Sequence, residues 1–111
     1  MLTQGQVEQE LARLIEAADD TAHDIADRAV EAARAEHDFK VAHARAYLRA
    51  EGPVASREAQ ALLAVEDLHL ARKIADARLL AAQEAARTIR ASMDALRSVN
   101  ATVRHAVGLD W

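Results

Sequence analysis

Residues that break helices are scarce in this chain, and this scarcity limits what it can fold into. Among 111 residues there are three glycines and one proline, and two of these four stand together as Gly52-Pro53. Alanine, the best helix former, supplies 28 residues. A Gly-Pro pair ends one helix and lets another begin. The sequence therefore predicts an all-α protein whose long helices fold back as a hairpin at Gly52-Pro53.

Capping signals place the expected helix ends. Thr3 and Gln6 have the spacing of a capping box, and Gly108 stands where a C-cap glycine belongs. Asp20 or Thr21 could cap a new helix, so the first half predicts either two helices or one continuous helix. The chain is expected to form a single domain, 1–111, with these elements in order: helix 6–18, helix 21–51, turn 52–54, helix 55–107 and tail 108–111.

The second half carries a heptad pattern of apolar residues, which is typical of coiled coils. A helix over 55–107 would be about 80 Å long, whereas a compact domain of this size has a radius of gyration of about 13 Å. This C-terminal helix must therefore pack on the first half, on other copies, or on both, and we expect a homo-oligomer. The seam is Ala75, Leu79, Ala82, Ala86, Ile89, Met93, Leu96, Asn100, Val103 and Val107, preceded by Ala61, Val65, Leu68 and, as a poor fit, Arg72.

Within this seam, the predicted oligomerisation residues are Leu79, Ile89, Met93, Leu96, Asn100, Val103 and Val107. Asn100 is expected to fix the register or the number of copies, as buried polar residues do in coiled coils. The first half is less regular. Its seam begins with Val7, Leu11, Leu14 and Ala18 and continues, with a shift of phase, through Ile25, Ala29, Phe39 and Ala46.

A basic stripe runs along the end of this chain of net charge −4. Arg90, Arg97 and Arg104 recur at every seventh residue, at position e beside the seam, with Asp94 the one acid among them. In one interpretation the stripe pairs with acids of the first half, across the hairpin or between subunits. In the other it stays open and binds phosphate groups. The candidate pairing acids are Asp19, Asp20, Asp24, Asp27 and Glu31.

Several classes of chemistry lack their signatures here. The absence of cysteine excludes disulfides, zinc-thiolate sites and thiol nucleophiles. Glu66 and His69 form half of a di-iron helix motif, but Asp20 and His23 make a poor second half, so no metal site is predicted. No catalytic residue or cofactor is expected, and the chain is not expected to be an enzyme. Without a long apolar run or a signal sequence, we expect a cytoplasmic protein that does not bind membranes.

Three segments together resemble small helical proteins from phage recombination regions and, more distantly, the UvsY family of recombination mediators. They are "FKVAHARAYLRAEG", "SREAQALLAVEDL" and "AARTIRASMDALRSVNATVRHAV", within roughly 37–107. The resemblance implies a non-enzymatic homo-oligomer that binds single-stranded DNA and helps to load a recombinase or an annealing protein, in the cytoplasm of a host bacterium. It places the DNA surface at Arg90, Arg97, Arg104 and His105, with Lys40, Arg45 and Arg49 as lesser candidates. Arg87, which flanks the arginine stripe, is also a predicted nucleic-acid contact.

Two other functions remain open. The acidic net charge favours an adaptor or structural oligomer that binds another protein and no nucleic acid. The length and central turn also match helical effectors of the WXG type. However, the turn reads "EGPVAS" without Trp-x-Gly, and the tail lacks the Tyr-x-x-x-Asp/Glu signal.

Overall fold

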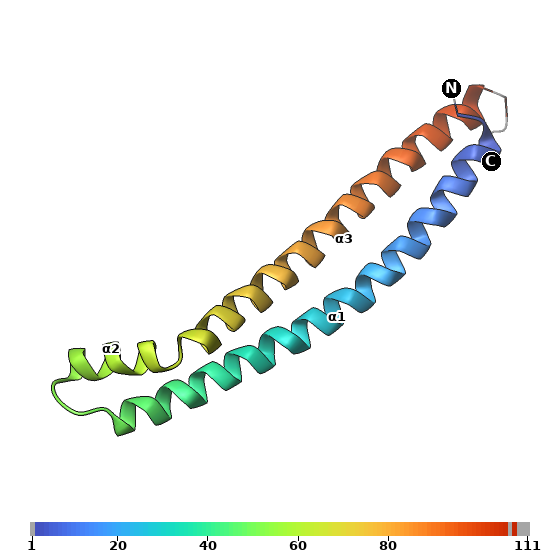
Figure 1. The fold of residues 1–111 in the computed structure, drawn as a ribbon. Helices are drawn as coiled ribbons and strands as arrows, with labels where there is room; N and C mark the ends of the chain where they lie inside the picture. The colour runs from blue at the N-terminus through green and yellow to red at the C-terminus, as the bar shows by residue number, and fades with distance from the viewer. Residues whose placement is uncertain (1, 107, 109–111) are drawn as a thin grey trace. The chain divides into compact units, whose positions relative to one another are not determined.

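The structure, a computed structural model, describes residues 2–106 and Gly108. Helices α1 (Gln4–Arg49), α2 (Val54–Ala64) and α3 (Glu66–Ala106) are its elements (Figure 1), and the described residues contain no strand. The all-α prediction is confirmed. The chain forms two compact units: a terminal unit of Met1–Ile25 with Ala82–Trp111, and a central unit of Ala26–Ala81.

The predicted capping box begins α1. The Thr3 amide N–H donates to Gln6 Oε1 over 2.9 Å, and the Gln6 amide N–H donates to Thr3 Oγ1 over 3.2 Å. Each side chain thus satisfies a backbone donor that the helix itself leaves without a partner.

Helix α1 runs without a break through the segment where a second helix could have started. The Thr21 hydroxyl donates to the Ala17 carbonyl over 2.7 Å, and His23 Nδ1 lies 2.9 Å from the Asp19 carbonyl oxygen. Both side chains bond back to the preceding turn, so Thr21 does not cap a new helix. Of the two alternatives for the first half, the continuous helix is confirmed.

The inward face of α1 keeps one heptad phase, which corrects the predicted phase shift. Ala29 is exposed, whereas Ala32 is buried. The polar residues Thr21 and Arg28 occupy half-buried seam positions. Because they are polar, the heptad spacing of this face is not visible in the apolar residues alone. The buried and half-buried positions with this spacing are Val7, Leu11, Leu14, Ala18, Thr21, Ile25, Arg28, Ala32, Ala35 and Phe39.

A turn at Gly52 and a break at Val65 set the bounds of α2. Gly52 has a φ of 104°, a left-handed conformation that glycine adopts without steric cost. The single helix predicted at 55–107 is wrong, because Val65 leaves the helical conformation at φ −121° and ψ 24°. Its amide N–H bonds to the Leu62 carbonyl, and Glu66 and Asp67 stabilise the start of α3 with their negative charge. The Val65 side chain is buried, so the break keeps the apolar seam facing inward.

Each unit has a narrow core. In the terminal unit the buried apolar residues are Val7, Leu14, Ala82 and Val103, and in the central unit they are Ala32, Ala61, Val65 and Ala75. Half of these residues are alanine, whose side chain buries little area. Val7 is the one large side chain among the described residues that is fully buried. The helices of each unit are therefore held by thin seams.

The predicted C-cap glycine has the expected conformation. Gly108 has a φ of 73°, and its amide N–H donates to the His105 carbonyl over 3.2 Å. Val107, the last predicted seam residue, and Trp111 lie outside the described residues.

Candidate binding site: a groove beside two arginines

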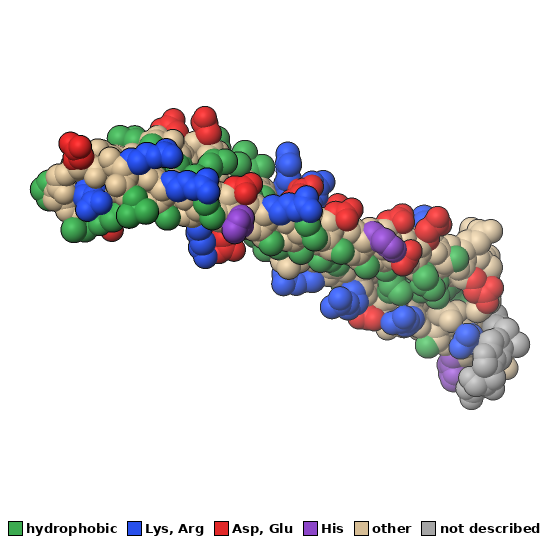
Figure 2. All heavy atoms as spheres, turned by 90° about the horizontal axis from the view of Figure 1, so that it is seen from below, with side chains coloured by type: hydrophobic (Ala, Val, Ile, Leu, Met, Phe, Trp, Pro, Cys, Tyr) green, Lys and Arg blue, Asp and Glu red, His purple; other side chains and the backbone are tan. Residues whose placement is uncertain are grey.

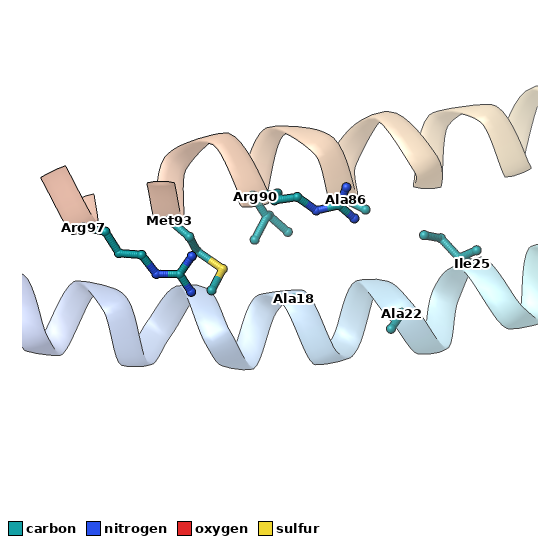
Figure 3. Close-up of a pocket in the computed structure, with 8 residues that line it drawn as sticks. Ala18, Ala22, Ile25, Ala86, Arg90, Met93 and Arg97 are labelled. Carbon is teal, nitrogen blue, oxygen red and sulfur yellow. The ribbon is translucent and has the colours of Figure 1, made fainter. Parts of the chain in front are cut away.

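A groove of about 340 Å³ lies between α1 and α3 of the terminal unit. Ala18, Ala22 and Ile25 line it from α1. The residues on the α3 side are Ala86, Ile89, Arg90, Met93 and Arg97. Figure 3 shows Arg90, Met93 and Arg97 extending from α3 along the space between the two helices. The site thus has an aliphatic floor and two cationic groups on one helix.

Small side chains at seam positions open this groove. Ala18 on α1 and Ala86 on α3 stand where coiled coils carry large residues, and Ala22 on α1 adds no bulk beside them. Ile25, Ile89 and Met93 cover the remaining walls. The groove itself could not be predicted, because a hollow depends on which alanines of the two helices meet. The lining residues that belong to predicted seams are Ala18, Ile25, Ala86, Ile89 and Met93.

The predicted arginine stripe, Arg90, Arg97 and Arg104, belongs to the terminal unit. Arg97 Nη1 donates to Asp94 Oδ1 of its own helix over 3.2 Å, and both side chains are well exposed. No described residue forms an ion pair or a hydrogen bond with the Arg90 guanidinium, which is exposed. Arg104 is half-buried. Two of the three arginines therefore lie open on the groove side of α3.

The other two predicted DNA-contact residues lie near the stripe on α3. Arg87 forms an ion pair with Glu84 one turn earlier, and His105 is exposed in the last turn of the helix. Neither residue lines the groove.

Acids of the first half do not pair with Arg90 or Arg97 in the described structure. The α1 residues that line the groove with both arginines are Ala18, Ala22 and Ile25, and none of them carries a charge. Asp19, Asp20 and Asp24 do not line the groove. The predicted pairing across the hairpin is therefore not formed by these two arginines. The other two candidate acids, Asp27 and Glu31, belong to the central unit.

Predicted oligomerisation residues are placed inside the two units. Val103 is buried, and Leu79, Ile89, Met93, Leu96 and Asn100 are half-buried on the inward face of α3. Their role between copies stays a prediction, since the structure contains one chain. Asn100 has a further property: its Oδ1 is buried without a hydrogen-bond partner. A buried amide oxygen in this state costs stability.

A polar and aromatic cluster replaces the apolar seam in the central unit. The Arg72 guanidinium lies 5.4 Å from the Phe39 ring centroid and 3.7 Å from Glu36 Oε1. His69 packs on the same ring at 5.2 Å between centroids. Lys40 Nζ is 2.8 Å from Glu36 Oε1, and this hydrogen bond, more than the neighbouring charges, lowers the pKa of Glu36. The misfit of Arg72 in the heptad is thereby explained.

The lesser DNA-contact candidates belong to the central unit, whereas the arginine stripe belongs to the terminal unit. Lys40 is held by Glu36, and Arg45 and Arg49 are exposed near the end of α1. Tyr47 lies under the guanidinium of Arg57, 4.6 Å from the ring centroid, so it contributes to packing between α1 and α2.

No protein family, curated protein or solved structure matches the chain. Within the described part of the chain, His, Asp and Glu side chains form no group of three that could hold a metal ion. The described helices also include none with enough length and apolar character to cross a membrane.

Proposed function

We propose that this protein is a non-enzymatic helical adaptor that acts as an assembly of identical copies. The observation that carries this proposal is the contrast between a thin core and an apolar exterior. Among the described residues, eleven large aliphatic side chains are exposed, whereas the core contains four valines and leucines. On the face drawn in Figure 2, apolar side chains reach the surface between the charged groups. Association would remove such side chains from water, and each Å² of apolar surface buried would stabilise the assembly by about 25 cal/mol.

One exposed stripe on α3 has the composition of a contact between two copies. Leu70 is 58% exposed and Ile74 is 43% exposed, and their spacing of four residues puts them on one face. Asp67 precedes them and Arg78 follows them on the same face. This outer stripe, Asp67–Leu70–Ile74–Arg78, therefore has an acid at one end, a base at the other and two large apolar residues between.

Such a stripe is complementary to itself when two copies meet in antiparallel orientation. Asp67 of one copy then lies beside Arg78 of the other, and Leu70 lies beside Ile74. A two-fold symmetric dimer needs this kind of self-complementary surface. Leu62 and Leu63 of α2 are also exposed in the central unit and would extend the apolar contact.

The mass of the protein in solution tests this proposal. Leu70→Glu with Ile74→Glu should convert the assembly to a species of lower mass while helicity is kept, because both positions are already exposed. The matched control is Ala12→Glu with Ala91→Glu, which adds two charges at exposed positions of the terminal unit. A wild type that is monomeric at high micromolar concentration would contradict the proposal.

A second candidate function is a recombination accessory that binds single-stranded DNA and a recombinase or annealing protein. The open position of Arg90 and Arg97 supports it, as does the resemblance to phage recombination proteins. Phosphate contacts would make the affinity fall with salt, with a slope of about −0.7 per contacted phosphate. Titration of labelled oligo(dT) at two salt concentrations measures this slope. Arg90→Gln, Arg97→Gln and Arg104→Gln together should then reduce both affinity and slope.

A further inference from the structure

We propose that the groove beside Arg90 and Arg97 binds an acidic amphipathic helix of a partner protein. This inference rests on the proposed adaptor function and names the site and the chemistry of its partner. Two neighbouring helices with a hollow between them can accept a third helix along their seam. Here the floor is aliphatic, and five of the eight lining residues belong to the apolar seams of α1 and α3.

The spacing of the two guanidinium groups defines the charge pattern of the partner. Arg90 and Arg97 are one heptad apart, which corresponds to about 10.5 Å along the helix axis. Carboxylates seven residues apart on a second helix have the same spacing. A helix with an acid at i, aliphatic residues at i+3 or i+4, and an acid at i+7 presents all of them on one face. Its aliphatic residues would enter the groove between the two arginines.

Both arginines can be engaged at little cost. Arg97 has a bond to Asp94, but that pair is well exposed, and exposed ion pairs contribute little stability. Arg90 has no ion pair among the described residues that would have to break. Ala18, Ala22 and Ile25, the α1 residues that line the groove with the arginines, carry no charge.

Features of the same unit disfavour other ligands. A single-stranded nucleic acid gains much of its affinity from bases stacking on aromatic rings, whereas the groove is lined by aliphatic side chains and arginine. An amphiphile with one anionic head would engage one of the two guanidinium groups.

A second copy of the chain does not supply the required helix. Within α1, α2 and α3, acids seven residues apart occur as Asp20/Asp27, Asp24/Glu31 and Glu31/Asp38. The third and fourth positions after the first acid of these pairs hold His, Asp, Arg or Ala and no large aliphatic residue. The partner helix is therefore expected on a different protein.

The experiment uses the full chain and a fluorescent, alanine-based helical peptide of roughly 20 residues, which is long enough to be helical. The peptide carries Glu at every seventh position and Leu three and four residues after each Glu. Fluorescence anisotropy should show binding to the wild type. Arg90→Gln with Arg97→Gln should weaken it tenfold or more, whereas Arg87→Gln, on α3 but outside the groove, should leave the affinity within twofold.

A second variant tests the groove without removing an arginine. Ala22→Glu places a carboxylate at an exposed position of α1 beside Arg90, and glutamate is a good helix former, so the fold should be kept. It should weaken peptide binding at least as much as the arginine double variant. A control peptide with Gln in place of Glu should bind at least tenfold more weakly to the wild type.

The inference would be overturned if the Glu/Leu peptide did not bind the wild type, or if it bound the double arginine variant equally well. It would also be overturned if oligo(dT) bound in place of the peptide and Ala22→Glu abolished that binding. Light scattering on the same samples separates this test from that of self-association. A monomer that binds the peptide would contradict the proposed self-association and support the proposed groove site. An assembly that does not bind the peptide would support self-association and contradict the groove site.

Discussion

The Arg72 guanidinium of α3 lies 5.4 Å from the centroid of the Phe39 ring of α1. This contact occupies a heptad position where an apolar residue is the usual choice. The same ring packs on His69 and His43, at 5.2 and 5.7 Å between centroids. One aromatic side chain thus joins α1 and α3 within the central unit, in a chain that has only three aromatic residues.

We expect Phe39→Ala to destabilise the protein by about 2 kcal/mol, less than a fully buried aromatic residue would cost, because the ring is half-buried. Chemical denaturation followed by circular dichroism measures the change. Leu48→Ala is the control, since Leu48 is 76% exposed and should change the free energy of unfolding by less than about 0.5 kcal/mol. Equal effects of the two variants would show that the Phe39 cluster does not hold the unit.

Asn100→Leu should raise the free energy of unfolding by about 1 kcal/mol. The Asn100 Oδ1 atom is buried without a hydrogen-bond partner, and leucine would replace this cost with apolar burial on the seam. Thermal unfolding measures the change, and light scattering shows whether the number of copies changes with it. A lower melting temperature would mean that the Asn100 side chain forms a hydrogen bond with a group outside this chain, such as a second copy.

Acid should weaken the central unit in part through Glu36. The hydrogen bond from Lys40, with the charges of Lys40 and Arg72, lowers the pKa of Glu36 below its ordinary value of 4.5. The unfolded chain then binds more protons than the folded chain between the folded pKa and 4.5, so the stabilising contribution is present above 4.5 and is lost as the pH falls through the folded pKa. Stability measured between pH 3 and 6 should therefore depend less on pH in Glu36→Gln. An unchanged slope would contradict this role of Glu36.

The sequence was sufficient to predict the helical class, the capping box at Thr3 and the turn at Gly52-Pro53, because these depend on local conformational preferences. Packing decided the rest. The break at Val65 is not marked by a glycine or a proline in the sequence. Thr21 and Arg28 interrupt the apolar pattern of α1, although they occupy positions of the same heptad phase. The groove depends on the register between α1 and α3, which neither helix specifies alone.

Charge reversal on the outer stripe tests the proposed contact between copies. Asp67→Arg places like charges opposite one another in the antiparallel arrangement and should weaken the assembly, and Arg78→Asp should do the same. The double variant restores opposite charges and should regain much of the wild-type association. The dissociation constant from sedimentation at several concentrations measures the coupling between the two positions. Purely additive effects would exclude this pairing.

The molar mass of the wild-type chain tests the central claim most directly. Multi-angle light scattering over a concentration series, at low and at physiological salt, gives this mass without an assumption about molecular shape. Self-association through exposed apolar residues predicts a mass at least twice the 12.1 kDa of one chain, and only a weak dependence on salt because the contact is mainly apolar. A mass of one chain at every concentration would contradict the account.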